Sequence, residues 1–531
     1  MTDASTAERA SATQRLAALH RLFVVALLGF ASGLPLALTG QAMQAWLSME
    51  GLDIATIGFL SLVGMPYTFK FLWAPLMDRF ELPWLGRRRG WLVLTQFALA
   101  GALLLMAGIS PGTATRAFAL LAVVVAFISA SQDVVIDAYR TDLLHTSERG
   151  LGASLNVLGY RLAMILSGGV ALIWTDPTQG GGWNWPQVYR LMAMLMAVAA
   201  LLSATILPPL KQARAPQGVA RHDVVGFIAV VAAVVAGALL TDRFGNALAQ
   251  VLLAPLFSGS GVSPALQAKW TELLALMLGI AVTLPLAAWA ARRARFETLL
   301  NGLASYFRQS GAGAFLAFIV LYKLGDAFAG ALMTPFLLKG MAFSPAEVGL
   351  VNKVIGLWLT IVGALVGGAL MVKLGLWRSL LLFGLLQMAS NVGFWWLSVS
   401  GRGLMPGLVI PAFDWGFVKL AADTPVDGGL LMVIAFENIS GGMGTAAFVA
   451  FLMSLCNQRF TATQYALLSA FASVGRVWVG PLAGVLAESI GWPTFFVLST
   501  IAAVPALAML IAMRGSVQAL EVDPNAPISD D

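Results

Sequence analysis

Asp133, Asp137, Asp326 and Glu437 are acidic residues inside long apolar stretches of this 531-residue sequence. A charge near the centre of a bilayer costs about 2.5–3.5 kcal/mol on insertion scales, so each needs a partner, water or a function. Asp133 and Asp137 are four residues apart and share one helix face. Two carboxylates this close resist ionising together, which suits a reversible proton carrier. Asp137 also lies near the inner end of its stretch beside Arg140, where a gate or scaffold role is the alternative.

Basic side chains accompany these acids. Lys323 lies three residues before Asp326, so the two can form a switchable pair or a permanent buried salt bridge. In the same way, Lys353 can serve as the countercharge of Glu437. The planar guanidinium of Arg161 either holds a cargo carboxylate or neutralises an acid on the preceding helix, Asp133.

Histidine does not provide a proton relay, because His20, His145 and His222 fall at loops or helix ends. The buried acids are therefore the candidates for proton coupling, in the order Asp326, Asp133, Glu437 and Asp137. Lys70 and Arg476 are interpreted as structural, Lys70 by extending its amine to the membrane surface. Gly29 and Gly33 are interpreted as positions where a broken or closely packed helix is allowed.

The composition indicates which solvent surrounds the chain. It is 59% hydrophobic and 11% charged, whereas soluble domains carry roughly 25% charged residues. Its net charge is +6, and the basic residues lie in short loops between apolar stretches. This location argues against nucleic acid as a partner. The sequence carries no P-loop, zinc motif or nucleophile elbow, so we expect no enzyme, no cofactor and no metal, and an ion gradient as the driving force.

Apolar stretches long enough for membrane spans form three groups. They lie at 22–46, 54–77, 91–109, 117–138, 151–174 and 188–207; at 224–241 and 271–290; and at 314–337, 347–372, 380–398, 429–455, 464–487 and 493–513. Lys and Arg concentrate in alternate loops, for example at 87–89 and 292–295. This asymmetry predicts that both termini are cytoplasmic.

The 6 + 2 + 6 grouping predicts an all-α membrane protein with the major facilitator fold, in which two six-helix bundles surround one cargo site. Weak echoes at 57–64 and 348–356 support a duplicated half. The expected pieces are a cytoplasmic N-terminus (1–21), an N-terminal bundle (22–207), a linker with the peripheral extra helix pair (208–311), a C-terminal bundle (312–513) and an acidic cytoplasmic tail (514–531).

Several motifs resemble the AmpG muropeptide permeases of the major facilitator superfamily. They are GFASGLPLAL (29–38), FKFLWAPLMDR (69–79), GRRRGW (86–91), ASQDVVIDAYRTD (130–142), LGYRLAM (158–164), YKLGDAFA (322–329), EVGLVNK (347–353), FENISGGMGT (436–445) and SVGRVWVGPLAG (473–484). They cover both six-helix groups. The inserted pair departs from members that carry extra helices at the C-terminus.

The resemblance implies proton-dependent import of GlcNAc-1,6-anhydroMurNAc and its peptides across the bacterial inner membrane for wall recycling, with a link to β-lactamase induction. Such a cargo bears carboxylates, amides, hydroxyls and an amine. Its candidate binding residues are Arg161, Lys323, Lys353, Gln44, Gln132, Asn156, Tyr160, Tyr322, Asn352 and Asn438. The superfamily's cytoplasmic gating loop resembles the segment around Asp78, Arg79, Arg87, Arg88 and Arg89, and Arg140 joins these gating candidates.

Two other readings stay open at this point. One is a major facilitator transporter of another peptide, sugar or drug. The other is a membrane enzyme or a receptor of muropeptides, against which the lack of a catalytic set and of a soluble output domain counts.

Overall fold

The computed structural model of the chain describes most of its residues. These are residues 2–520 except 75–76, 78–79, 84, 145–148, 179–181, 211–219, 259–260, 297–299, 301–303, 305–306, 308–310, 417 and 456–460. The gating candidates Asp78 and Arg79 lie outside the described residues, as does the acidic stretch 521–531 of the expected tail.

The first group of helices covers the N-terminal part of the chain. It comprises α1 (Thr2–Leu38), α2 (Gln41–Met49), α3 (Ile54–Leu60), η1 (Ser61–Gly64), α4 (Met65–Phe69), η2 (Lys70–Leu72), α6 (Arg87–Met106), α7 (Thr115–Leu143), α8 (Arg149–Met164), η4 (Ile165–Val170), α9 (Ala171–Trp174) and α10 (Trp185–Ile206). We call this group the first half.

The inserted pair and the second half follow. The pair is α11 (Ala220–Leu240), η5 (Thr241–Gly245), α12 (Asn246–Phe257) and α13 (Pro264–Arg293). The second half comprises α15 (Ala312–Ala331), α16 (Met333–Pro335), η6 (Phe336–Gly340), α17 (Pro345–Val348), η7 (Gly349–Ile355), α18 (Gly356–Leu374), α19 (Leu376–Ser400), β1 (Leu408–Ile410), β2 (Phe413–Asp414), β3 (Lys419–Leu420), β4 (Thr424–Val426), α20 (Gly428–Ser454), α21 (Thr461–Ala512) and α22 (Arg514–Gln518).

The expected membrane spans all have helical counterparts. Within the described residues, 12 helices are long and apolar enough to cross a membrane, and a shorter apolar helix runs over Ile54–Phe69. One of the long runs, in α21, contains two helices, because Gly491 inside it has a non-helical φ of 75°. The structure differs at the N-terminus, where α1 already begins at Thr2. No proline or glycine interrupts residues 2–28, so nothing ends the helix there.

Glycines let helices pack at backbone contact, as expected for Gly29 and Gly33. A Cβ on Gly33 would lie 2.3 Å from the carbonyl oxygen of Tyr160 in α8. A Cβ on Gly29 would meet the carbonyl of Asn156 in the same way. The second half repeats the device between α18 and α20, where a Cβ on Gly363 would lie 2.2 Å from the carbonyl oxygen of Ile439. The helix that carries Tyr160 and Arg161 is thereby held against α1.

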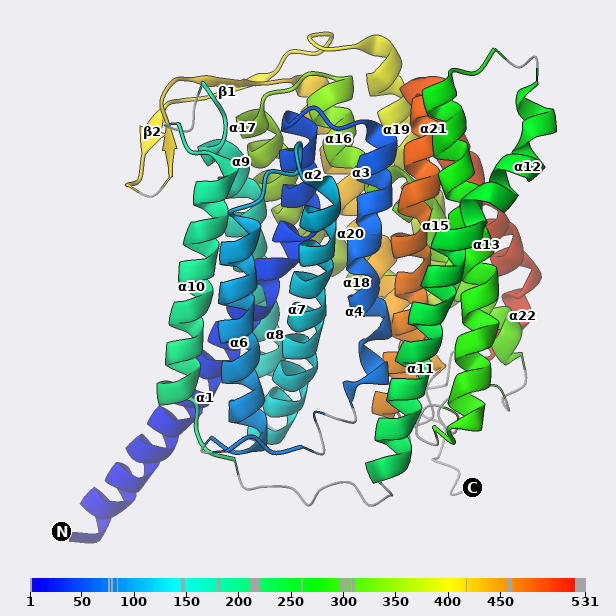
Figure 1. Cartoon of the computed structure of the whole chain (residues 1–531). Coiled ribbons are helices and arrows are strands. Elements are labelled where there is room, and N and C mark those ends of the chain that lie inside the picture. The colour runs from blue at the N-terminus through cyan, green and yellow to red at the C-terminus, as the bar shows by residue number, and fades with distance from the viewer. Residues whose placement is uncertain are drawn as a thin grey trace.

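The two halves meet near the end of the bundle that carries the strands. In Figure 1 the antiparallel pairs β1–β4 and β2–β3 lie at this end together with α2, α3, α9, α16 and α17. We call it the strand face; the start of α1 lies at the opposite face. The largest apolar cluster joins both halves, with Trp46 from α2 and Phe336 from η6 among its buried members.

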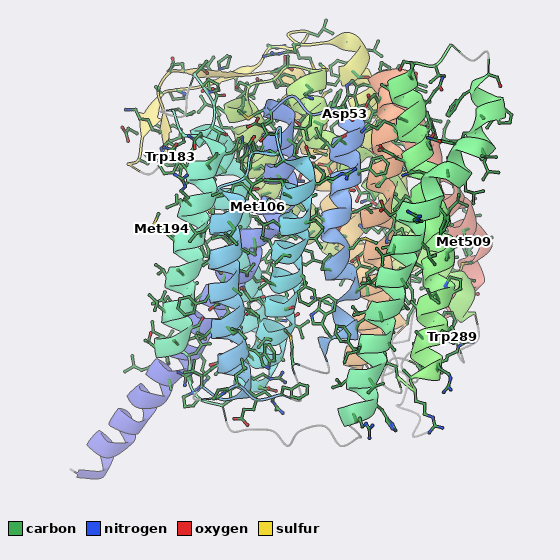
Figure 2. All side chains as sticks on the ribbon, in the orientation of Figure 1. Asp53, Met106, Trp183, Met194, Trp289 and Met509 are labelled. Atoms are coloured by element: carbon green, nitrogen blue, oxygen red, sulfur yellow. The ribbon has the colours of Figure 1, made fainter. Side chains whose placement is uncertain are left out.

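The inserted pair lies beside the bundle, as expected. Figure 1 shows α13 next to α21, against which it packs, and α11 packs against α13. Figure 2 shows Trp289 of α13 and Met194 of α10 at opposite sides of the bundle. Their side chains are 62% and 57% exposed, respectively. Large apolar side chains on the outside are typical of helices whose solvent is lipid.

Candidate functional site

A cavity of about 920 Å³ lies between the two halves. Its volume is at the upper end of the range for small-molecule sites, roughly 300–1,000 Å³. One wall, called here the first-half wall, comes from α1–α4, α7 and α8, and its polar members include Gln44, Tyr67, Lys70, Asp137, Tyr160 and Arg161. The second-half wall comes from α15, α18, α20 and neighbouring turns, and includes Asp326, Asn352, Lys353, Thr360, Glu437 and Asn438. No described residue of the inserted pair lines the cavity.

The cavity is closed on the strand face by contacts between the halves. Gln44 Nε2 donates to the carbonyl oxygen of Ala331 over 3.0 Å. The backbone N–H of Ala346 donates to Asp176 Oδ2 over 2.9 Å, and the amine of Lys339 donates to the carbonyl of Leu52. At the other end Asp137, which lines the cavity, has a side chain that is 57% exposed. The cavity therefore opens toward the opposite face.

Asp133 lies behind the first-half wall with two close neighbours. Ser32 Oγ donates to Asp133 Oδ1 over 2.6 Å, and Lys70 interacts with the same carboxylate electrostatically. Lys70 itself lines the cavity. The structural role predicted for Lys70 from the sequence does not include this place beside an acid. The only sign of this role in the sequence is that Lys70 carries a charge inside an apolar stretch.

Arg161 faces the cavity without a protein partner. Its side chain lines the wall beside Tyr160 and, among the described residues, forms no hydrogen bond or ion pair. Two roles are open for Arg161 from the sequence, to hold a cargo carboxylate or to neutralise Asp133. Lys70, and not Arg161, is the cation that interacts with Asp133. The geometry thus favours a guanidinium that is available to an anionic group of a cargo.

The second-half wall holds Lys353 and Glu437 in a polar network. The Lys353 amine donates to Gln41 Oε1 of the first half, and it interacts electrostatically with Glu437. Asn438 Nδ2 donates to Glu437 Oε2 over 2.7 Å. Lys353 therefore links the two halves while it also serves as the expected countercharge.

Asp326 connects the cavity with a small pocket of about 10 Å³ inside the second half. The expected pair is present, with Lys323 Nζ 3.9 Å from Asp326 Oδ2. The amine of Lys323 also lies 5.2 Å from the ring centroid of Phe448. Asp326 and Glu437 interact as like charges across the second-half wall. The sequence could not show this neighbourhood, because the two acids are on different helices.

Four candidate cargo residues do not line the cavity. Lys323 is buried behind Asp326, and Gln132 is fully buried. The hydroxyl of Tyr322 donates to the carbonyl of Leu380 and lines the small pocket. Asn156 Oδ1 accepts a 2.8 Å hydrogen bond from Arg140. The remaining six candidates, Gln44, Tyr160, Arg161, Asn352, Lys353 and Asn438, all line it.

The described gating candidates lie at the opposite face and tie helices together. Arg140 Nη2 lies 3.2 Å from Asp137 Oδ1 on the same helix, and Arg140 joins α7 to α8 through its hydrogen bond to Asn156. Arg88 Nε lies 3.3 Å from Asp142 Oδ2, and Arg89 Nη2 donates to the carbonyl of Ala204 over 2.8 Å. Arg87 begins α6.

Comparisons with known proteins agree on a transporter. The chain is 42% identical over 505 residues to the anhydromuropeptide permease of Escherichia coli, covering 95% of this chain and 82% of that protein. It is 26% identical to putative transporter AmpG 4 of Rickettsia conorii, covering 94% and 97% of the two chains. A family model described as acetyl-coenzyme A transporter 1 matches residues 21–178. A crystal structure of the peptide transporter POT with sulfate shares the fold, with a TM-score of 0.60 at 16% identity over 94% of this chain and 95% of that one.

Proposed function

The chain belongs to the AmpG family of anhydromuropeptide permeases, and we propose that it imports GlcNAc-1,6-anhydroMurNAc and its peptides from periplasm to cytoplasm for wall recycling. The relative that is 42% identical carries that name. The observation that carries the proposal is the cavity of about 920 Å³ with Arg161 unpartnered in its wall. This volume accommodates a disaccharide peptide, and the guanidinium matches the carboxylates of a stem peptide.

Transport proceeds by alternating access in this proposal. Residues 22–207 and 312–513 act as the two moving bundles, and the structure described here is closed at the strand face. The concentration of Lys and Arg in alternate loops supports a cytoplasmic location for both termini. The strand face then faces the periplasm, and the cavity opens to the cytoplasm of the bacterial inner membrane. Delivery of muropeptides to the cytoplasm is the step that would link the protein to β-lactamase induction.

Protons drive the import in this proposal, with Asp326 as the first candidate for the coupling site. Asp326 lines the cavity, pairs with Lys323 and is close enough to Glu437 for mutual repulsion. A proton on either carboxylate relieves that repulsion and releases a lysine to another partner. Glu437, Asp133 and Asp137 remain further candidates. Arg161, Lys353 and the polar groups Gln44, Tyr160, Asn352 and Asn438 hold the cargo.

Uptake by proteoliposomes tests this function. The purified full-length protein is reconstituted, and entry of labelled GlcNAc-anhydroMurNAc-tripeptide is followed with an acidic exterior. Accumulation above the outside concentration is expected, and it should collapse with a protonophore. The same tripeptide without sugars serves as the control cargo. Equal uptake of that control would indicate a peptide transporter of another kind. Binding without uptake would indicate a receptor.

A further inference from the structure

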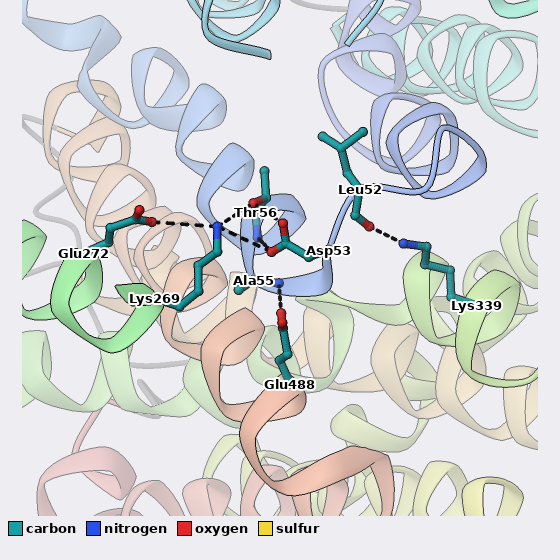
Figure 3. Close-up of polar contacts among 8 residues, drawn as sticks. All are labelled: Leu52, Asp53, Ala55, Thr56, Lys269, Glu272, Lys339 and Glu488. Atoms are coloured by element: carbon teal, nitrogen blue, oxygen red, sulfur yellow. Dashed lines mark hydrogen bonds and ion pairs between the residues drawn. The ribbon is translucent and has the colours of Figure 1, made fainter. Parts of the chain in front are cut away.

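The inserted helix pair touches both halves of the protein at the strand face. Helix α13 begins at Pro264, and its second turn carries Lys269 and Trp270. Lys269 Nζ lies 2.8 Å from Thr56 Oγ1 and 3.5 Å from Asp53 Oδ1, both at the start of α3 in the first half (Figure 3). Trp270 Nε1 donates to Ser489 Oγ of α21 in the second half over 3.0 Å. Two neighbouring residues of one helix thus hold one partner in each half.

Apolar contacts reinforce this three-way junction. Ala55 of α3, Leu273 of α13 and Val485 of α21 are buried together, and the rings of Phe59 and Trp270 pack on them. Each of the three helices contributes one buried member. The junction is therefore a packed contact of the inserted pair and not a single surface ion pair.

The two helices that α13 joins, α3 and α21, also contact each other across the two halves near the strand face. A Cβ on Gly58 of α3 would lie 2.5 Å from the carbonyl oxygen of Gly480 in α21, so the two backbones are in contact. Beside them the backbone N–H of Ala55 donates to Glu488 Oε2 over 3.0 Å. Figure 2 shows Asp53 at the start of α3, on the strand face and beside α21.

The same helix continues into the cavity wall. After α3, the turns η1 and α4 present Ser61, Gly64 and Tyr67 to the cavity, and Lys70 follows. Separation of α3 from α21 would therefore remove one of the contacts that close the cavity at the strand face. Any group that fixes α3 to α21 opposes that separation.

We propose that the inserted helix pair is a latch on the strand-face gate, in which Lys269 holds the start of α3 and Trp270 holds α21 while the gate is closed. The pair lies outside the cavity and acts on the equilibrium between closed and open strand faces. This inference rests on the alternating access of the proposed function. It does not depend on the identity of the cargo.

Distance measurements between the halves test the latch without cargo. The full-length protein in lipid nanodiscs carries Cys456→Ser, and spin labels replace two exposed threonines of the strand face, Thr113 in the first half and Thr494 in the second. Each label reports one half, so opening of the strand face adds a longer distance to the distribution.

The variants separate the effect of the Lys269 charge, the effect of the Trp270 hydrogen bond and the effect of an unrelated substitution. Lys269→Met and Trp270→Phe should each raise the long-distance population about two- to fivefold, the range for a partly exposed polar contact. Lys269→Arg keeps the charge and should match the parent. Lys419→Met removes an exposed pair with Asp414 elsewhere on the strand face, 3.2 Å long, and is the control.

The outcome is decisive in either direction. A graded shift, with Lys269→Arg and Lys419→Met at the parent distribution, supports the latch. If Lys269→Met and Trp270→Phe give the same distribution as Lys419→Met, the inserted pair does not hold the gate. Failure of muropeptide uptake would leave this result unchanged, so the two proposals fail separately.

Discussion

The two walls of the cavity differ in how their charges are partnered. In the first-half wall Lys70 and Asp137 have charged neighbours, whereas Arg161 has no protein partner among the described residues. In the second-half wall Asp326 pairs with Lys323, Lys353 bonds Gln41, and Glu437 accepts from Asn438. An unpartnered cation is ready for a ligand, whereas linked acids and lysines respond to a proton. We propose from this difference that cargo recognition lies mainly in the first half and coupling mainly in the second.

Neutralising Asp326 gives the largest expected effect. Asp326→Asn should abolish accumulation driven by a pH gradient, because the carboxylate that repels Glu437 no longer takes up a proton. Cargo exchange without a gradient should persist. Both are measured in proteoliposomes, with Asp414→Asn as the control because Asp414 pairs with Lys419 in an exposed position away from the cavity. Unchanged accumulation would remove Asp326 from coupling.

Removing the guanidinium of Arg161 should weaken cargo binding. A hydrogen bond to a charged group is worth about 1.5–3 kcal/mol, so Arg161→Ala should raise the KM for uptake roughly 10- to 100-fold. For a muropeptide with amidated carboxylates, the same substitution should raise the KM much less. Arg190→Ala changes an exposed arginine of α10 and serves as the control. An equal loss for both cargoes would make Arg161 structural.

Lys70 tests whether the first-half wall contains a second functional cation. Because Lys70 interacts with Asp133 in a water-accessible cavity, Lys70→Met should raise the KM only about two- to fivefold. The double variant with Asp133→Asn measures how much of that effect comes through the acid. A loss of accumulation as complete as in Asp326→Asn would move part of the coupling into the first half.

The smallest expected effect concerns pH at the strand face. Burial raises the pKa of Asp53, but hydrogen bonds from Thr56 and the charge of Lys269 outweigh this effect and hold the pKa below its ordinary value. Glu272, Glu488 and Lys339 are the other charged groups at this junction. A carboxylate with a lowered pKa stabilises the closed state above its ordinary pKa and loses that effect as the pH falls through the lowered value.

The spin-label distances between Thr113 and Thr494 should therefore stay constant from about pH 8 to about pH 5 and lengthen only at a pH below the ordinary pKa of an aspartate. This result would separate the gate from the cavity walls, where we expect the proposed coupling acids to respond to the physiological gradient. Opening of the gate near neutral pH would contradict it.

Hydropathy and short-range spacing carried most of what could be predicted from the sequence. Apolar runs located the helices, and the three-residue spacing of Lys323 and Asp326 predicted their pair. The close packing of Gly29 and Gly33 was also predicted, because small residues are typical of helix contacts in lipid. These features depend on one helix or on residue size alone.

The features of the site that could not be predicted from the sequence depend on contacts between helices. Lys70 reaches Asp133 and Lys353 reaches Gln41 only because separate helices meet, and no spacing along the chain encodes that. For the same reason Gln132 and Asn156 were placed among cargo residues, although their helices turn them into the bundle. The side that a polar residue faces within a bundle is a tertiary property.

Simultaneous measurement of cargo and proton entry tests the division between the walls most directly. Proteoliposomes with no initial pH gradient receive an inward gradient of labelled muropeptide, and an internal dye reports pH. The parent and, at saturating cargo, Arg161→Ala should acidify the interior as cargo enters. Asp326→Asn should admit cargo without acidification. Acidification by Asp326→Asn, or its loss in Arg161→Ala at saturating cargo, would contradict the assignment of recognition and coupling to opposite walls.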